Sequence, residues 1–97
     1  MFELKFEWDK NKDNTNQKKH RVSFSEDKTV FYDGNAIEFY DPDHSYEENR
    51  FILLGLSDKL RILVVSYLYK KGKKEDIIRI FSTRKATKIE LKSYKER

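Results

Sequence analysis

The chain has 97 residues, with 21 lysines and arginines against 17 aspartates and glutamates, so its formal net charge at pH 7 is +4. This length suits one domain, and we expect a single domain over residues 1–97. Cysteine is absent, which excludes a disulfide framework, a thiolate zinc site and a cysteine nucleophile. No stretch approaches the about 18 consecutive apolar residues of a membrane span, and the N-terminus lacks a secretory signal pattern, so we expect a cytoplasmic protein.

The two halves of the chain differ in charge. Residues 1–58 carry 8 basic and 13 acidic side chains, whereas residues 59–97 carry 13 basic and 4 acidic ones. Between residues 33 and 58, seven acidic side chains accompany a single basic one, Arg50. Such a two-signed chain suggests a polyanion bound at one surface and a basic partner at another. Folding can also intermix the charges, and composition leaves both interpretations open.

The N-terminal part of the chain predicts a strand and then an ambiguous segment. Residues 2–8 alternate apolar and charged side chains, which is typical of a strand with one buried face. Asp9 offers a helix N-cap to the residues that follow. Residues 10–20, however, have no apolar stripe, so their pattern alone fits a loop or a weak helix.

The next two elements have clearer boundaries. Ser23 and Glu26 have the spacing of a capping box, which predicts a short helix over about residues 24–32. Gly34 can adopt the left-handed conformation that ends such a helix. A short strand is expected over residues 36–40, and the only proline of the chain closes it in a turn.

Three apolar runs predict the main strands, at residues 51–56, 62–69 and 77–81. The turns between them are short, so the strands should pair as an antiparallel meander. Residues 85–96 place a few apolar side chains among charges, which predicts a short amphipathic helix. The expected fold class is therefore α+β, with an antiparallel sheet, two N-terminal helices and a C-terminal helix.

Several kinds of active site are excluded by the residue pattern. The two histidines, His20 and His44, do not have the spacing of a helical zinc site. Residues 55–58 lack the second glycine of a nucleophile elbow, and the scattered glycines form no phosphate-binding loop. The acidic residues between 38 and 48 are better explained as a solvated or partner-facing rim than as a metal site.

The positive signal is a set of arginines in or beside apolar strands: Arg61, Arg79 and Arg84. Strand alternation places Arg79 on the same face as Ile77 and Phe81. A guanidinium in that setting needs an anionic partner, which can be a carboxylate of the protein or a phosphate. Three such arginines in an aromatic-rich chain favour RNA, whose unpaired bases stack on aromatic and guanidinium planes.

A set of short motifs runs in a fixed order from residue 6 to residue 94. It includes Phe6-Glu7-Trp8-Asp9, Lys19-His20, Val22-Ser23-Phe24, Val30-Phe31, His44-Ser45, Gly55-Leu56-Ser57, Arg61, Arg79-Ile80, Arg84 and Tyr94. Each motif is weak alone, but the ordered set is specific. In these residues the sequence resembles the BrnT family of ribonuclease toxins from type II toxin–antitoxin modules. The resemblance implies a RelE-like fold, and it implies that residues 10–20 form a helix.

The sequence departs from the pattern of this family at a few turn and packing positions. Lys10 replaces a common proline, Arg21 a common glycine, and Leu60 the glycine that usually precedes Arg61. Thr83 stands where alanine is frequent. These departures concern local geometry more than activity.

The arginine pattern and the resemblance together predict a ribonuclease that needs no metal, because the 2′-hydroxyl of RNA can itself attack the phosphate. Preorganised cations then stabilise the charge that develops on phosphorus. We expect this role for Arg61, Arg79 and Arg84. His20 is the best candidate for proton transfer, because imidazole exchanges protons near neutral pH. Further RNA contacts are expected from Lys19, Arg50, Lys85 and Tyr94, with Tyr94 stacking on a base.

Structural roles remain open for some of these residues. His20, at the predicted end of a helix, can interact with the helix dipole. Arg84 can form an ion pair with Glu90 or Glu7. His44, in the acidic segment, is better explained as a capping or hydrogen-bonding residue.

The resemblance also implies a partner. We expect a cognate ribbon-helix-helix-type antitoxin, similar to BrnA, in a hetero-oligomer that binds operator DNA through the antitoxin. No cofactor or metal is expected. The acidic region is a candidate contact for a basic antitoxin surface, to be tested by charge reversal at Glu38, Asp41 and Asp43. The alternative function is a non-catalytic RNA-binding module, or a degenerate toxin that acts only as co-repressor with its antitoxin.

Overall fold

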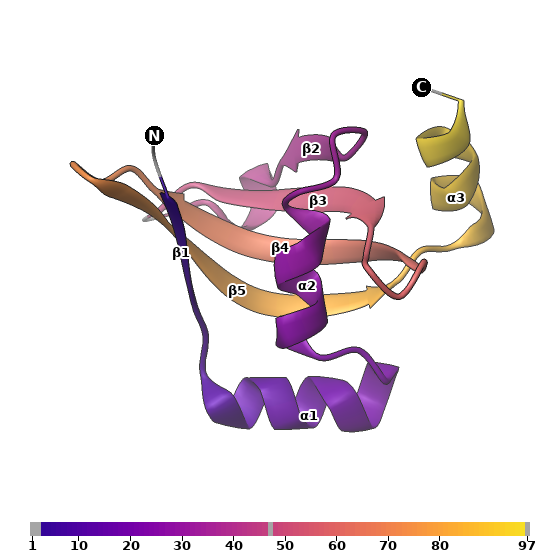
Figure 1. The fold of residues 1–97 in the computed structure, drawn as a ribbon, viewed down its shortest axis with the longest axis horizontal. Helices are drawn as coiled ribbons and strands as arrows, with labels where there is room; N and C mark the ends of the chain where they lie inside the picture. The colour runs from indigo at the N-terminus through magenta and orange to yellow at the C-terminus, as the bar shows by residue number, and fades with distance from the viewer. Residues whose placement is uncertain (1–2, 47, 97) are drawn as a thin grey trace.

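The computed structural model describes residues 3–46 and 48–96 (Figure 1). Within these residues one sheet is built from β1 (Glu3–Glu7), β2 (Ile37–Tyr40), β3 (Arg50–Leu56), β4 (Ile62–Lys70) and β5 (Glu75–Lys85). The helices are α1 (Lys10–His20), α2 (Phe24–Val30) and α3 (Lys88–Lys95), with a 3₁₀ turn, η1, at Pro42–His44. The α+β class is therefore confirmed, and so is the helix that the resemblance implied at residues 10–20. Phe2, in the predicted first strand, lies outside the described residues.

The strands follow the order β1-β5-β4-β3-β2. Strands β3 to β5 form the antiparallel meander that their short turns predict, and β2 also pairs antiparallel with β3, whereas β1 pairs with β5 in parallel. The sheet is therefore mixed, because the first strand lies at one edge and runs parallel to the last strand. The last strand continues to Lys85, so α3 begins later than the predicted residue 85. Thr87 caps α3: its hydroxyl accepts from the backbone N–H of Glu90, whose carboxylate accepts from the Thr87 N–H.

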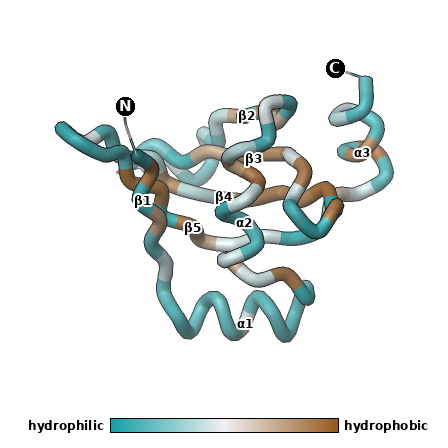
Figure 2. Tube along the Cα trace, in the orientation of Figure 1, coloured by the Kyte–Doolittle hydropathy of each residue, from teal (hydrophilic) through white to brown (hydrophobic). Residues whose placement is uncertain are grey.

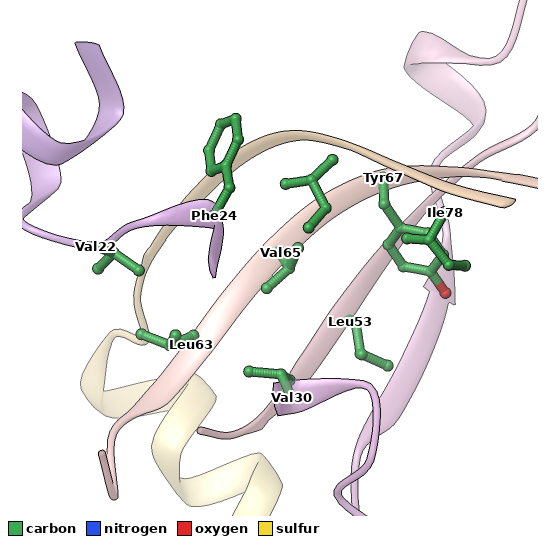
Figure 3. Close-up of a cluster of buried hydrophobic side chains, with 9 residues drawn as sticks. Val22, Phe24, Val30, Leu53, Leu63, Val65, Tyr67 and Ile78 are labelled. Atoms are coloured by element: carbon green, nitrogen blue, oxygen red, sulfur yellow. The ribbon is translucent and has the colours of Figure 1, made fainter. Parts of the chain in front are cut away.

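The hydrophobic core lies between α2 and one face of the sheet (Figure 3). Its buried side chains come from α2 and the turn before it and from the three central strands: Val22, Phe24, Val30, Leu53, Leu63, Val65, Tyr67, Ile78 and Ile80. Gly55 permits the close approach of α2 to β3, because a Cβ there would lie 2.8 Å from Cγ1 of Val30. Burial of these aliphatic and aromatic side chains is the main stabilising contribution to the fold.

Helix α1 is hydrophilic along its whole length (Figure 2). The Asp9 carboxylate caps it by accepting from two backbone N–H groups of the first turn, at 2.7 and 3.2 Å. Asn16 is buried, and its side-chain amide donates to the carbonyl of Val22 and accepts from the N–H of Thr83, at 3.0 and 3.1 Å. Polar contacts therefore hold α1 beside the part of β5 that extends beyond β1.

Strand β5 contains a bulge at Phe81. Two consecutive residues of β4 pair with Ser82 and Ile80, so Phe81 is an extra residue in β5. A bulge of one residue shifts the alternation of side chains along the strand. Arg79 and Arg84, which strict alternation would place on opposite faces, therefore lie on the same face of the sheet.

Candidate functional site

The face of the sheet opposite α2 carries arginines from two strands. Arg50 of β3 pairs with Leu68 of β4, Leu68 pairs with Arg79 of β5, and Arg79 pairs with Glu7 of β1. Directly paired residues point to the same side of a sheet, so these side chains form a row across it. Arg84 follows on the same side, one bulge further along β5. We call the surface that carries Arg50, Arg79 and Arg84 the arginine face.

All three arginines of this face have carboxylate partners, and that of Arg50 is Glu48, at 3.4 Å. Arg84 donates two hydrogen bonds to Glu90, at 2.7 and 3.0 Å, and these bonds hold the pKa of Glu90 down at about 2. This is one of the two structural partners that the sequence left open for Arg84. Arg79 lies 3.6 Å from Glu7, and the two side chains are 38% and 41% exposed. Exposed ion pairs contribute little, so Arg79 can exchange Glu7 for a phosphate at low cost.

A hollow of about 370 Å³ lies between α1 and the bulge of β5. Lys12, Lys19 and His20 line it from the helix, and Phe81 and Ser82 line it from the strand. Two of the residues predicted from the sequence, Lys19 and His20, are thus brought together beside an aromatic ring. Cations and an imidazole around a ring are suited to a nucleotide, which offers a phosphate and a base for stacking.

A second hollow, of about 180 Å³, shares Phe81 and Ser82 with the first and is also lined by Arg50 and His44. The Arg50 guanidinium carbon lies 4.0 Å from the centroid of the Phe81 ring, and the Lys12 ammonium lies 5.5 Å from it. The ring therefore holds two cations by cation–π contact. We call the two hollows together the Phe81 groove.

Arg61 belongs to a different cluster, beneath α2. Its guanidinium forms an ion pair with the buried carboxylate of Glu26 and donates to the backbone carbonyl of Arg21 at 3.1 Å. Ser57 also donates to Glu26, at 2.6 Å. Burial alone would raise the pKa of Glu26, but the hydrogen bonds from Arg61 and Ser57 outweigh it and lower the pKa. In the structure Arg61 thus neutralises a buried carboxylate.

The last two residues predicted to contact RNA lie toward the C-terminus. Lys85 is exposed at the end of β5. Tyr94 lies on α3, and its hydroxyl donates to the carboxylate of Asp33 at 2.6 Å. This bond ties α3 to the loop that follows α2. The structure therefore places Tyr94 in a contact between elements, and it does not bring Tyr94 together with Lys19 and His20.

Several residues of the Phe81 groove were not predicted as site residues from the sequence. Lys12, Phe81 and Ser82 line it, and their grouping depends on the bulge in β5 and on the position of α1. Among residues 3–46 and 48–96, no three His, Cys, Asp or Glu side chains gather where they could hold a metal ion. Of the helices in the described part of the chain, none is long and apolar enough to cross a membrane.

The fold and the site define a small α+β protein with a cationic face and an aromatic groove, which is a surface suited to a polyanion. Comparison with known families identifies it further. The sequence model of the ribonuclease toxin BrnT, of type II toxin–antitoxin systems, matches residues 8–90. The chain therefore belongs to the BrnT family of ribonuclease toxins.

Solved structures agree with this family in fold. The crystal structure of the Brucella abortus ribonuclease toxin BrnT matches with a TM-score of 0.61 and 22% sequence identity, over 89% of this chain and 99% of that one. No curated protein matches the sequence. The family implies an antitoxin partner for this chain, and the crystal structure supports the arrangement of its strands and helices.

Proposed function

We propose that the protein is a metal-independent endoribonuclease of RelE-like type that cleaves RNA in the cytoplasm, inhibits translation and growth, and is neutralised by its antitoxin. The observation that carries this proposal is the composition of the Phe81 groove. Lys19 and His20 line one of its hollows and Arg50 lines the other, Phe81 borders both, and the adjoining sheet face carries Arg79. This arrangement offers cations for a phosphate, a ring for a base and an imidazole for a proton.

The chemistry uses the 2′-hydroxyl of the substrate as the nucleophile. This oxygen attacks the adjacent phosphorus, and the bond from phosphorus to the 5′-oxygen breaks in line with the attack. The protein must remove one proton, deliver another to the leaving oxygen and stabilise the negative charge that builds up on the phosphorane. All three tasks can be performed by side chains alone, because the nucleophile is part of the RNA.

The carboxylate partner of each arginine indicates which role that arginine can have in the reaction. Arg50 and Arg79 flank Leu68 on the arginine face, where their partners are exposed carboxylates. A preorganised donor aimed at the developing charge contributes about 10²–10³ in rate. Arg84 shares its charge with Glu90 and Arg61 with the buried Glu26, so we assign these two to holding the site in shape and placing positive potential near it.

We further propose that the antitoxin is of ribbon-helix-helix type and that the complex binds operator DNA through it. The acidic segment supports a basic contact surface. Asp43 is exposed in η1, next to the edge strand β2, where Phe39 and Tyr40 are also exposed. Glu38 and Asp41 have partners of their own, because Glu38 accepts from Tyr67 and Asp41 from His44.

The test is cleavage of RNA by the purified chain in the presence of EDTA. We expect cleavage by the wild type and a loss of about 10²-fold or more for Arg79→Ala. The matched control is Lys92→Ala, which removes a lysine that is 74% exposed on α3 and should cleave like the wild type.

A strict magnesium requirement would contradict the metal-independent mechanism. Retardation of RNA without cleavage would instead support the alternative function, a binding module or a degenerate toxin. A soluble, folded Arg79→Ala protein with full activity would remove Arg79 from the site.

A further inference from the structure

We propose that His44 is the catalytic base of the ribonuclease and that Asp41 is its positioning residue. This assignment rests on the ribonuclease function proposed above and names the group that accepts the proton of the 2′-hydroxyl. It is carried by the geometry of the turn between β2 and β3, which closes one end of the Phe81 groove.

The turn is fixed at both ends by hydrogen bonds. The backbone N–H of Asp41 donates to the carbonyl of Arg50 at 2.9 Å. The Ser45 hydroxyl accepts from the N–H of Arg50 at 3.0 Å and donates to the carbonyl of Asp41. Pro42 begins the 3₁₀ turn η1, which suits its fixed φ. These contacts hold His44 and Arg50 at the same end of the groove.

Within this turn His44 and Asp41 form a hydrogen-bonded pair. Nδ1 of His44 lies 2.9 Å from Oδ2 of Asp41. A carboxylate only accepts hydrogen bonds, so Nδ1 must carry the proton of this bond. Nε2 is then the unprotonated nitrogen of the neutral ring and is available as a base. A carboxylate that orients an imidazole in this way fixes its tautomer and stabilises the imidazolium formed when the ring takes a proton.

The position of His44 gives this pair access to a substrate. The His44 side chain is 67% exposed, and it lines the same hollow as Arg50, Phe81 and Ser82. Phe81 and Ser82 also line the hollow that contains His20, so the two histidines of the chain border two hollows that share these residues.

In the described part of the chain, the charged groups that face His44 come from its own turn and from β3. Besides Asp41, they are Glu48 and Arg50, which line the neighbouring hollow with His44 and form an ion pair at 3.4 Å. The residues that β4 and β5 contribute beside it, Ser66, Phe81 and Ser82, carry no charge. Among residues 3–46 and 48–96, the charged side chains that line the hollows beside His44 are therefore two carboxylates and one guanidinium.

In the proposed cleavage reaction, His44 removes one proton and His20 supplies one. Nε2 of His44 takes the proton of the 2′-hydroxyl, the 2′-oxygen bonds to phosphorus, and the bond from phosphorus to the 5′-oxygen breaks. Protonated His20 supplies a proton to the leaving 5′-oxygen. The products carry a 2′,3′-cyclic phosphate and a 5′-hydroxyl. His44 then releases its proton to solvent and His20 takes one up, which restores the starting state.

The experiment measures cleavage of a short single-stranded RNA by the purified chain in EDTA, from pH 5 to pH 9. We expect His44→Gln to lower kcat by about 10²–10⁴-fold and to remove the loss of rate that the wild type shows toward acid pH. Asp41→Asn should lower kcat by roughly 10²-fold with little change in KM, because an amide can favour the wrong tautomer. The control is Asp43→Asn, an exposed neighbour in the same turn that should cleave like the wild type.

Circular dichroism of each variant establishes that it is folded. If the wild type cleaves and folded His44→Gln keeps the same rate and pH profile, the assignment of His44 is overturned while the ribonuclease function stands. If Asp41→Asn matches the wild type in rate and profile, Asp41 is not the positioning residue. If the wild type itself leaves the RNA intact, the ribonuclease function fails and the assignment falls with it.

Discussion

The buried carboxyl of Asp27 makes the stability of the fold depend on pH. Asp27 lies on α2 with 0% of its surface exposed. Burial raises the pKa of Asp27 to about 8, and the nearby carboxylates of Glu26 and Asp13 add to the increase, while Thr83 and Arg61 offset part of it. At neutral pH the folded protein therefore keeps a proton on Asp27 that the unfolded chain has released.

The size of the effect follows from the two pKa values. An ordinary aspartate has a pKa of 3.8, so the folded-state value of about 8 is raised. A raised pKa means that the stabilising contribution is complete below about pH 4 and is lost as the pH rises toward 8. Each pKa unit corresponds to about 1.4 kcal/mol, so the free energy of unfolding should fall by about 3 to 4 kcal/mol between pH 5 and pH 8.

The assay compares urea unfolding of the wild type and Asp27→Asn at pH 5, 6, 7 and 8. The amide has the same shape but no titrating proton, so the difference in unfolding free energy between the two proteins isolates Asp27. We expect this difference to shift in favour of the variant by about 3 to 4 kcal/mol from pH 5 to pH 8. Parallel pH dependences for the two proteins would refute the reasoning.

Three other substitutions test separate parts of the structure. Arg61→Ala leaves the buried carboxylate of Glu26 without its ion pair and should cost about 3 kcal/mol or more in urea unfolding; a loss below about 1 kcal/mol would mean that the pair is dispensable. Leu60 has a left-handed backbone at φ 61° and a side chain that is 80% exposed, so Leu60→Gly should stabilise the fold by up to about 1 kcal/mol. A lower melting temperature for this variant than for the wild type would contradict the expectation. Asp43→Lys should weaken antitoxin affinity in calorimetry without unfolding the chain, and an unchanged affinity would assign that side chain to solvent.

The sequence predicted the helix and strands whose formation depends on residues close together in the chain. The Ser23 hydroxyl accepts from the backbone N–H of Glu26, as the capping-box spacing indicates. The Glu26 side chain, however, is drawn to Arg61 and Ser57, which are distant in sequence. The apolar runs of β3 and β4 are likewise evident in the sequence, since β3 has no exposed residue and β4 is exposed only at its last two residues.

The departures from the family pattern fall at positions with defined backbone geometry. Lys10 is the first residue of α1, where proline is favoured because its fixed φ suits the helix. Arg21 and Leu60 both have positive φ, at 59° and 61°, the region in which glycine is least strained. Two positions at which glycine is common in the family thus have left-handed backbone in this structure.

The parts of the site that depend on distant contacts could not be predicted. The bulge at Phe81 is a property of how β5 pairs with β4, and strict alternation places Arg84 on the other face from Arg79. Helix α1 depends on the buried amide of Asn16, which bonds to residues outside the helix. Sequence patterns therefore identified the basic residues, and only the fold shows which of them share a surface.

The central claim is that RNA bound in the Phe81 groove is cleaved when the 2′-hydroxyl of the RNA attacks the adjacent phosphorus. The most direct measurement compares, in EDTA, one RNA oligonucleotide with a copy in which the nucleotide before the cleaved bond is replaced by its 2′-deoxy form, with products identified by mass spectrometry. The account predicts that the all-RNA strand yields a fragment ending in a 2′,3′-cyclic phosphate and that the substituted bond stays intact. Cleavage at the 2′-deoxy position would contradict it.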